Sequence, residues 1–323
     1  MKETEGAQTR STPSVSVVIP AYNVAPYIGE TLNSVFAQTF TDFEVIVVDD
    51  GSRDGEELER MLEPYRRCVR YVRQENRGAG AARNRGVREA QGEFIAFLDS
   101  DDLWSPEYLG EQVRFLSEDG YDLAYADALL FGDSPIAGKT YMQTAPSVGP
   151  VTFLSLVRNE CNIITSGVVA RRCALVKVGL FNESLRNGQD FELWTRLARS
   201  GARLGYQRKV LLRYRCREGS LSGDIMNRLT RETRVYRYIA DNYDLTAAER
   251  AEVSHAMELQ RGAVDLATAK LNLLDGQFDE ARSAFERAHG VLGGWKLRAV
   301  VLMLRVAPRL LRRLALSRLR TAS

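Results

Sequence analysis

The chain has 323 residues, of which 45% are hydrophobic and 27% are charged, and its formal net charge is +2. These values are typical of a soluble globular protein of about two domains, and they exclude a disordered, collagen-like or polytopic membrane protein. The small net charge gives no basic field that would indicate a nucleic-acid partner. The charge is uneven, however. Residues 295–323 hold eight Lys or Arg and no Asp or Glu, so residues 1–294 carry −6 because the whole chain carries +2.

Cysteine and histidine are sparse and scattered. The four cysteines include no C-x-x-C pair, and the two histidines, His255 and His289, stand late in the chain. This excludes most zinc sites and any nucleophile activated by histidine, and it favours a reducing compartment. Residues 1–13 are polar, without an apolar signal segment, and are predicted to be flexible. The longest apolar run near the C-terminus, 299–304, is far shorter than the ~20 residues of a membrane span, so we expect a cytoplasmic protein.

Residues 14–222 alternate short apolar runs with segments of helical periodicity. We expect strands at 15–19, 43–48, 69–72 and 94–98, a mixture of helix and strand over 151–217 that ends with Val210-Leu-Leu-Arg-Tyr-Arg215, and helices at 25–38, 56–67, 80–90 and 106–116. Ser105 is the expected N-cap of the last of these helices, with Pro106 at its first position. Residues 132–150 are expected to form a long loop. Strands that are apolar on both faces and separated by helices predict an α/β domain, with a mostly parallel sheet covered on both sides.

From about residue 226 the pattern is helical throughout. Residues 226–290 are expected to form a helical cap. The stretch 276–288 resembles one tetratricopeptide helix pair, but a solenoid needs about three repeats. The pattern of residues 295–323 predicts a basic amphipathic helix, with arginines at 305, 309, 312, 313 and 320. On an acidic body such a helix is typical of a segment that binds an anionic membrane surface. The alternative is a solvated face that packs against the domain.

Two carboxylate clusters follow predicted strands, Asp49-Asp50 and Asp99-Ser-Asp-Asp102. Ligands bind beyond the carboxyl ends of the strands in open parallel sheets, so both clusters lie where a site is expected. Three carboxylates within four residues repel one another, and a divalent cation removes this cost. Mg²⁺ and Mn²⁺ prefer oxygen ligands and often share one or two carboxylates with substrate phosphates. The alternative for the second cluster is a solvated turn that caps a helix.

Six segments, in this order and spacing, carry a resemblance to a known family. They are Pro20-Ala-Tyr-Asn23, Val47-Val-Asp-Asp-Gly-Ser-x-Asp54, Asn76-x-Gly-x-Gly-x-Ala-Arg-Asn-x-Gly86, Phe97-Leu-Asp-Ser-Asp-Asp102, Val178-Gly-Leu-Phe-Asn-Glu183 and Gln189-Asp-Phe-Glu-Leu-Trp194. Residues 14–222 thereby resemble the glycosyltransferase family 2 domain, which has the GT-A fold. The resemblance implies a Rossmann-like, mostly parallel sheet that binds a nucleotide-diphosphate sugar.

The resemblance also implies roles for the residues at matching positions. The implied nucleotide-binding residues are Pro20, Ala21, Tyr22, Asn23, Asp50, Gly51, Arg83, Asp99 and Ser100. Among them, Asp50 would accept a hydrogen bond from the base, which is uracil in most members. Asp101, together with Asp99, would bind Mn²⁺ or Mg²⁺ at the donor diphosphate. Asp190 would be the catalytic base.

These roles imply one reaction. A metal at Asp101 would stabilise the departing nucleoside diphosphate, and Asp190 would accept the proton of the attacking acceptor hydroxyl, with inversion in a single displacement. We expect a UDP-sugar donor and a cell-surface glycan acceptor on a lipid carrier, reached from the inner face of the membrane. The absence of a Q-x-x-R-W motif favours the transfer of one sugar per encounter over processive synthesis.

Each assignment has a simpler alternative. Asp50 could form only an Asx turn with Gly51, Asp190 could only cap a helix, and Arg83 could be a surface charge. A cap and a catalytic role can also hold together, because a capping carboxylate is well oriented. The alternatives therefore differ mainly in where the side chains lie.

Two positions depart from the family pattern. Gln189 stands where Glu is common, and Arg217 stands where many members have a histidine that could hold metal or phosphate. Arginine clamps phosphate but does not bind metal, so a third protein ligand is left open. These changes are the only support for one alternative function, a non-catalytic scaffold. A sugar-1-phosphate nucleotidyltransferase would need a Gly-rich basic loop after the first strand. A dehydrogenase would need the full dinucleotide fingerprint there, and the chain has neither feature.

Overall fold

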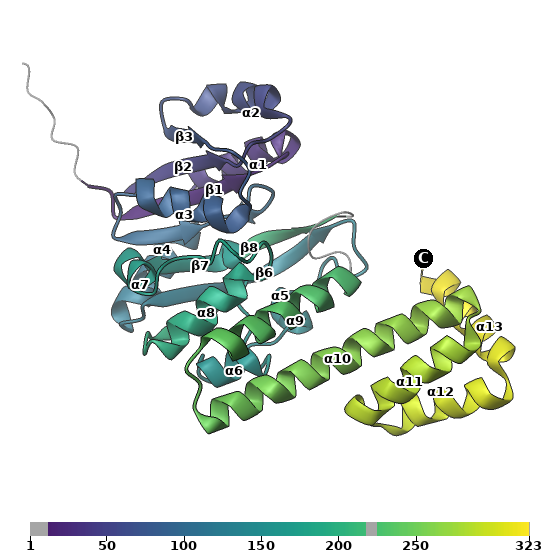
Figure 1. The fold of residues 1–323 in the computed structure, drawn as a ribbon. Coiled ribbons are helices and arrows are strands. Elements are labelled where there is room, and N and C mark those ends of the chain that lie inside the picture. Colours follow the sequence, from purple (N-terminus) through teal and green to yellow (C-terminus); the bar gives the residue numbers. More distant parts are fainter. Residues whose placement is uncertain (1–11, 218–224, 323) are drawn as a thin grey trace, which may run out of the picture. The chain divides into compact units, whose positions relative to one another are not determined.

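The computed structural model describes residues 12–217 and 225–322 of the chain. The chain divides into two compact units, residues 1–217 and residues 218–323 (Figure 1). The segment expected to be flexible, 1–13, lies outside the described residues except for its last two positions.

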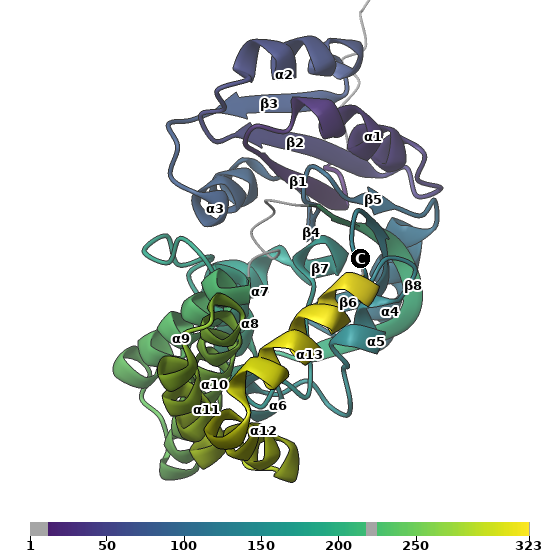
Figure 2. The ribbon, with the colours of Figure 1, turned by 90° about the vertical axis from the view of Figure 1, so that its right-hand side faces the viewer.

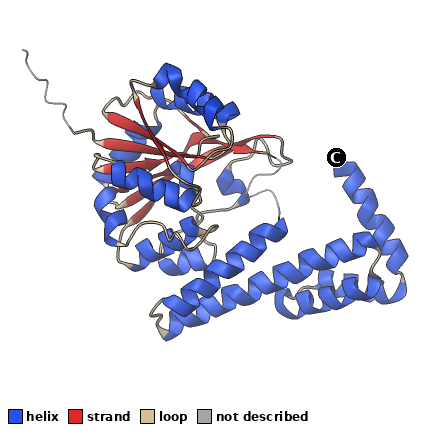
Figure 3. Cartoon of the chain, turned by 45° about the horizontal axis from the view of Figure 1, so that its top comes forward, coloured by secondary structure: helices blue, strands red, loops and turns tan. Residues whose placement is uncertain are grey.

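The first unit is built on an eight-stranded sheet with the order β3-β2-β1-β4-β7-β6-β8-β5. The strands are β1 (Val15–Ala21), β2 (Phe43–Asp49), β3 (Val69–Arg73), β4 (Phe94–Phe97), β5 (Leu103–Trp104), β6 (Leu123–Gly132), β7 (Val168–Arg171) and β8 (Leu204–Cys216). β1 to β4 are mutually parallel, β7 is antiparallel to β4 and β6, and β8 is parallel to β6 but antiparallel to β5. The predicted α/β class with a mostly parallel sheet is confirmed (Figure 3).

Helices lie on both faces of this sheet. They are α1 (Ala25–Phe36), α2 (Gly55–Leu62), α3 (Ala79–Glu89), α4 (Tyr108–Glu118), α5 (Tyr141–Thr144), α6 (Phe153–Val157), α7 (Arg172–Lys177) and α8 (Gln189–Arg199), with short 3-10 turns η1 (Glu63–Tyr65) and η2 (Thr165–Gly167). Figure 2 shows α1 and α3 on opposite sides of β1 and β2. The predicted loop 132–150 contains the short helix α5, and β5, β6 and β7 are not among the predicted strands.

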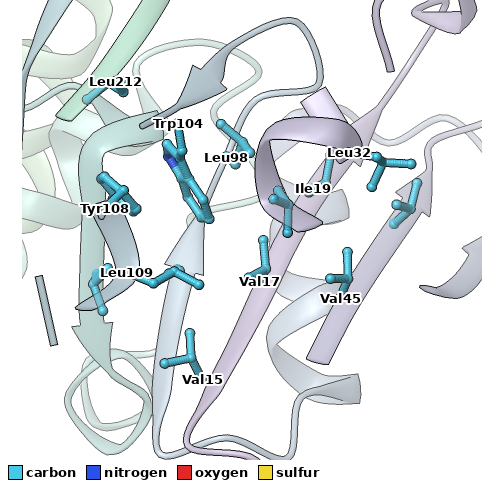
Figure 4. Close-up of a cluster of buried hydrophobic side chains, with 14 of the residues drawn as sticks. Val15, Val17, Ile19, Leu32, Val45, Leu98, Trp104, Tyr108, Leu109 and Leu212 are labelled. Carbon is cyan, nitrogen blue, oxygen red and sulfur yellow. The ribbon is translucent and has the colours of Figure 1, made fainter. Parts of the chain in front are cut away.

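The two faces of β1 bury different side chains. Val15, Val17 and Ile19 belong to a core shared with α1, α2 and α4, whereas Val18 belongs to a second core shared with α3, α7 and α8. Successive side chains of a strand point to opposite faces, so a continuous apolar run serves both cores. Figure 4 shows the first core, where Leu32 of α1 lies beside β1 and β2. The sheet is therefore sealed on both sides, and its strand ends are the places left for a site.

The helix expected to begin at Pro106 begins at Tyr108, so the prediction of Ser105 as its N-cap is wrong. Leu103 and Trp104 form β5, which pairs with β8. The Ser105 N–H then donates to the carbonyl of Leu211 on β8. Pairing with a distant strand thus keeps the chain extended beyond the local helix-start signal.

Gly86 explains how closely α3 approaches the sheet. A Cβ at this position would overlap the side chain of Val18 on β1. Only glycine allows helix and strand to pack at this distance. This contact fixes α3, and with it Arg83 one turn earlier, over the carboxyl-terminal part of the sheet.

The described part of the second unit is helical. Its helices are α9 (Ile225–Asn242), α10 (Ala247–Asp275), α11 (Phe278–Leu292), α12 (Trp295–Val306) and α13 (Pro308–Ala322). Thr246 caps α10 in a reciprocal capping box with Glu249, and the helix ends at Gly276 in the left-handed conformation. The tetratricopeptide-like stretch 276–288 forms this turn and most of α11, whose apolar face packs on α10.

The tail 295–323 is not one helix, so the prediction of a continuous amphipathic helix is wrong. The break lies at Ala307, directly before Pro308. Proline lacks an N–H group and disfavours the α conformation at the residue that precedes it. The arginine spacing across this point therefore does not describe one helical face.

One face of the tail packs on the helical unit. Leu304 of α12 is buried in a core with residues of α10 and α11. Arg305 pairs with Glu286 at 2.7 Å, and Arg312 donates from Nε to the carbonyl of Leu274 at 2.8 Å. Packing against the domain, the alternative to membrane binding, thus describes part of the tail. No helix in the described ranges is both long and apolar enough to cross a bilayer.

Candidate active site

The loop after β2 gives the residues of the Asp49-Asp50 pair different environments. Asp49 is fully buried and accepts hydrogen bonds from the Ser52 N–H (2.8 Å) and the Tyr71 hydroxyl (2.8 Å). Burial, and then this hydrogen bond, raises the pKa of the Tyr71 phenol. Asp49 therefore shapes the turn and is shielded from any ligand.

Asp50 binds the loop that follows β3 through three hydrogen bonds. Its Oδ1 accepts from Gln74 Nε2 (2.8 Å) and from the Arg77 N–H (2.9 Å), and its Oδ2 accepts from the Gly78 N–H (2.7 Å). The residue is only 2% exposed. A carboxylate has about four acceptor positions, so these three bonds leave about one for another donor. These bonds of Asp50 run to the loop after β3 and not to its own turn, so the Asx-turn alternative for Asp50 is wrong.

Gly51 allows the loops after β2 and β3 to meet. Its φ is +71°, and a Cβ there would come within 2.9 Å of the Asn76 nitrogen. A side chain would be strained by both the conformation and the contact. The glycine of the Asp-Asp-Gly-Ser segment thus keeps Asp50 within reach of its backbone donors.

The end of β1 supplies four predicted nucleotide-binding residues. Pro20 and Ala21 are buried as the last residues of the strand, whereas Tyr22 is 43% exposed. Asn23 has a left-handed backbone (φ 54°), and its Oδ1 accepts from the Arg53 N–H at 2.9 Å. Asn23 therefore joins this loop to the loop after β2, and Tyr22 and Asn23 are the exposed residues of the four.

Arg83 of α3 is the buried cation of the site. Its side chain is 7% exposed, so the surface-charge alternative is wrong. Its Nη2 lies 2.5 Å from Asp99 Oδ1, and its guanidinium lies 5.5 Å from the centre of the Phe181 ring. Burial alone would lower the pKa of Arg83, but the charges of Asp99 and then Asp190 raise it. Arg83 thus connects the loop after β4 with the first turn of α8.

The loop after β4 places its acidic residues in unequal environments. Asp101 Oδ2 lies 3.0 Å from Arg217 Nε. Burial, and then the charge of Asp99, raises the pKa of Asp101 against the opposing effect of Arg217. Asp102 is buried, which raises its pKa well above the usual value, and its Oδ1 accepts from the Arg215 N–H at 2.8 Å. Asp99 and Asp101 are therefore the partly exposed pair, while Asp102 fastens the loop to β8.

Ser100 lies between these carboxylates and is 5% exposed. Its carbonyl accepts from the Thr31 hydroxyl of α1 at 3.0 Å, and the same hydroxyl lies 3.0 Å from the Asp102 carbonyl. α1 thus holds the main chain of the loop from one side and β8 from the other. Ser100 contributes to the position of the acidic pair through its backbone.

Asp190 lies in the first turn of α8. The helix begins at Gln189 after Gly188, so Asp190 is not its N-cap and that alternative is wrong. Its Oδ1 accepts from the Phe191 N–H (2.8 Å) and its Oδ2 from the Thr165 hydroxyl (3.2 Å). The positive end of a helix also favours a carboxylate here. Both oxygens of Asp190 are thus oriented by the chain.

The turn η2 positions residues of the site, although no sequence motif predicts it. Thr165 contacts Asp190, and the neighbouring Ser166 hydroxyl accepts from the Asp99 N–H at 3.1 Å. The Ser166 carbonyl accepts from Trp104 Nε1 at 2.8 Å. η2 therefore links the acidic loop to Asp190. The Ser166 and Asp99 positions are 67 residues apart, so no local motif could have revealed the contact.

The structure brings the predicted residues together in two groups at neighbouring strand ends. In one group, Arg83 connects Asp99 to Asp190, and Asp99 lies close enough to Asp101 to affect its pKa. The other group consists of Asp50 and the loops after β1 and β2. Within residues 12–217 and 225–322, no three His, Cys, Asp or Glu side chains are placed to hold one metal ion. A metal at the acidic pair would need further ligands from a bound molecule.

Comparison with known proteins identifies the family. Residues 16–178, half of the chain, match the family model described as Glycosyl transferase family 2. The chain belongs to glycosyl transferase family 2. An uncharacterised glycosyltransferase of Rickettsia conorii is 33% identical to it over 224 residues, which are 66% of this chain and 36% of that protein. The chain thus spans about a third of the length of that relative.

A second relative has a more specific name. WfgD of Escherichia coli, a UDP-Glc:α-D-GlcNAc-diphosphoundecaprenol β-1,3-glucosyltransferase, is 28% identical over 222 residues. The match covers 68% of this chain and 83% of WfgD.

Solved structures of glycosyltransferases confirm the GT-A fold. TarS of Staphylococcus aureus in complex with UDP-GlcNAc has a TM-score of 0.63 and 25% identity, over 96% of this chain and 92% of that one. The mannosyltransferase PcManGT of Pyrobaculum calidifontis, in complex with GDP-Man and Mn²⁺, has a TM-score of 0.64 and 20% identity, over 95% of this chain and 85% of that one.

Proposed function

We propose that the protein transfers a single sugar from a UDP-sugar to an acceptor hydroxyl, with inversion at the anomeric carbon. The observation that carries this proposal is the grouping of three carboxylates at the end of β4, where Arg83 lies close to Asp99 and Asp190, and Asp99 lies close to Asp101. It combines a carboxylate pair suited to a metal and a diphosphate with a third carboxylate suited to accept a proton. Membership of family 2 and the UDP-GlcNAc complex of TarS support a nucleotide-sugar donor.

Asp101 and Asp99 are the proposed ligands of Mn²⁺ or Mg²⁺. Burial, and then the charge of Asp99, raises the pKa of Asp101. Two neighbouring carboxylates of this kind fit a hard cation that takes its other ligands from diphosphate and water. When bound, the ion supplies Lewis-acid stabilisation of the departing nucleoside diphosphate. The Mn²⁺ in the PcManGT complex supports this choice of cation.

Asp190 is the proposed base. Thr165 and the Phe191 N–H fix its two oxygens, so the carboxylate is oriented before the acceptor arrives. It accepts the proton of the acceptor hydroxyl at about 2.6–3.2 Å while that oxygen attacks the anomeric carbon. Arg83, close to both Asp99 and Asp190, offsets the negative charge that the donor brings. No covalent nucleophile is needed, so one displacement inverts the configuration.

The loops after β1 and β2 form the proposed nucleotide site. Asp50 retains about one acceptor position, which fits the imide N–H of uracil. Tyr22 exposes its ring beside this loop, and an aromatic face stacks well on a base. Asn23 and Gly51 hold the two loops in place.

A panel of nucleotide sugars tests the proposed reaction. The full-length protein should release UDP from at least one UDP-sugar, about tenfold or more faster with Mn²⁺ than with EDTA. Nucleotide binding without turnover across the whole panel would instead favour the non-catalytic scaffold. Formation of a nucleotide sugar from a nucleoside triphosphate and a sugar 1-phosphate would favour the nucleotidyltransferase alternative.

A lipid-linked acceptor in cell-surface glycan synthesis is proposed for the same activity. The name of WfgD, with its diphosphoundecaprenol acceptor, supports it. The tail offers a surface for an anionic membrane at the inner face. We define the tail surface by its exposed residues Trp295, Leu302, Val306, Arg309, Leu310, Arg313 and Leu314. Large apolar side chains beside arginines are typical of helices that lie in a lipid interface.

Vesicle binding tests the tail surface. A variant with Arg309→Gln and Arg313→Gln should bind phosphatidylglycerol vesicles about thirtyfold more weakly, since each basic residue near the surface contributes about 1 kcal/mol. The matched control is Arg234→Gln with Arg237→Gln, which removes two exposed arginines of α9. Added salt should weaken binding of the unmodified protein. Equal cosedimentation of the two double variants would contradict the proposed role.

A further inference from the structure

The carboxylate proposed to bind the metal already has a cation beside it. Arg217 Nε lies 3.0 Å from Asp101 Oδ2, and the two side chains are 36% and 19% exposed. The main chain brings them together. Arg215 lies two residues earlier, on β8. It donates from Nε to the Asp101 carbonyl (2.8 Å) and from its N–H to Asp102 Oδ1 (2.8 Å). The acidic loop is thus fastened to the end of β8, with Arg217 opposite Asp101.

An aromatic ring also contacts Arg217. The Tyr27 ring of α1 lies 4.9 Å from the Arg217 guanidinium and 5.2 Å from that of Arg215. Both cations are attracted by the ring. Arg215 has its own carboxylate, Glu30, at 2.6 Å. Among the residues that the structure describes, Asp101 is the one carboxylate that pairs with Arg217.

We propose that Arg217 is an exchangeable counter-ion of the metal-binding carboxylate: it neutralises Asp101 while the donor is absent, and it moves to the donor diphosphate when metal and donor bind. This inference rests on the proposed function, because it takes Asp101 as a metal ligand. A guanidinium and a divalent cation at one carboxylate oxygen repel each other strongly. A diphosphate offers Arg217 more negative charge and the bidentate geometry that guanidinium prefers.

This exchange couples the binding of metal and nucleotide. A metal that binds alone must displace Arg217 from Asp101 and leaves that arginine without an anionic partner. When a diphosphate is present, Arg217 has a new partner and the displacement costs little. Because coupling between two sites is reciprocal, the nucleotide also binds more tightly once the metal is bound. Arg217 therefore favours the state that holds both over the states that hold one.

Mn²⁺ binding to the full-length protein, followed by the electron paramagnetic resonance signal of free Mn²⁺, tests the exchange without turnover. Arg217→Ala should bind Mn²⁺ about fivefold more tightly than the unmodified protein when no nucleotide is present, because a partly exposed ion pair no longer competes. With saturating UDP this difference should fall below about twofold. With saturating Mn²⁺, UDP should bind the variant about fivefold more weakly, since a charge-assisted contact is lost, whereas without metal its affinity should change by less than about twofold. Arg217→Gln, which keeps a polar side chain beside Tyr27, should behave in the same way.

Arg213→Ala is the matched control. Arg213 also lies on β8, stacks on the Phe131 ring at 4.4 Å and has no carboxylate partner in the described part of the chain. Its loss should change both affinities by less than about twofold.

The exchange would be overturned if both Arg217 variants bound Mn²⁺ no more tightly than the unmodified protein in the absence of nucleotide. The proposed function would not be affected by that result, because the panel of nucleotide sugars tests it separately. If the unmodified protein binds no Mn²⁺ even with UDP, the exchange and the metal ligands fail together. Sugar transfer with EDTA present would then leave the rest of the proposed function standing.

Discussion

Replacing Asp190 with asparagine should lower kcat by about a thousandfold and change the affinity for UDP by less than about twofold. Asparagine has nearly the same shape and keeps an oxygen that can accept from the Thr165 hydroxyl, but it cannot take up the proton of an attacking hydroxyl. The neighbours of Asp190 are Thr165, Phe191 and Arg83, and none of them belongs to the loops proposed for the base. Steady-state kinetics and calorimetry with UDP measure the two effects separately.

Two further variants separate chemistry from structure. Asp279→Asn is the control, because Asp279 is also a carboxylate in the first turn of a helix, α11, and its loss should leave kcat unchanged. Thr165→Val removes the hydroxyl that orients Asp190 and should lower kcat about tenfold, with Thr165→Ser restoring it. If Asp190→Asn turned over at the rate of the unmodified protein, another group would have to accept the proton.

The fold of residues 15–98 is predicted well because its signals are local. Apolar runs and helical periodicity give β1 to β4 and α1 to α3 to within a few residues, apart from the short 3-10 turn that ends the second helix. The strands β5 and β7 have two and four residues, and both pair with antiparallel partners far along the chain. Such pairing depends on long-range register, which a local pattern does not contain. The same cause explains the wrong N-cap at Ser105.

The second unit shows an error that the sequence could have prevented. The arginine spacing between residues 305 and 320 favours one continuous helix. Pro308 stands inside that stretch, and a proline in a helix interior removes a hydrogen bond and clashes with the preceding turn. This effect of proline on a helix explains the observed break at Ala307.

The motifs identify the residue types of the site but not their partners. Position at a strand end predicts that Asp99 and Asp101 lie near a ligand. Their arginines come from 16 and 116 residues away along the chain, so the ion pairs arise only from the tertiary fold. The family pattern marks Arg217 as a departure, yet it cannot show that this arginine lies on Asp101 itself. The burial of Arg83 cannot be predicted from the motifs, because it too arises from the tertiary fold.

Asp101→Asn should lower Mn²⁺-dependent turnover by about a thousandfold, because charge stabilisation by a bound metal contributes several kcal/mol. The fold should survive the change. Burial, and then the charge of Asp99, raises the pKa of Asp101 in the folded protein. The ionised carboxylate is therefore less favourable in the folded protein than in the unfolded chain. This destabilisation is present above the raised pKa and disappears as the pH falls below it. A neutral asparagine removes it. The Tm of the metal-free variant at pH 7 should therefore equal or exceed that of the unmodified protein in scanning fluorimetry.

The neighbouring carboxylate provides the contrast. Asp99→Asn also removes a proposed metal ligand, so Mn²⁺-dependent turnover should fall here too. In addition it leaves the Arg83 guanidinium, with its side chain 7% exposed, without the carboxylate that lies 2.5 Å away. A buried charge that loses its partner destabilises a protein by about 3 kcal/mol, so Tm should fall for Asp99→Asn and not for Asp101→Asn. Full Mn²⁺-dependent turnover in Asp101→Asn would exclude Asp101 as a ligand, and a stable Asp99→Asn would show that Asp190 alone can balance Arg83.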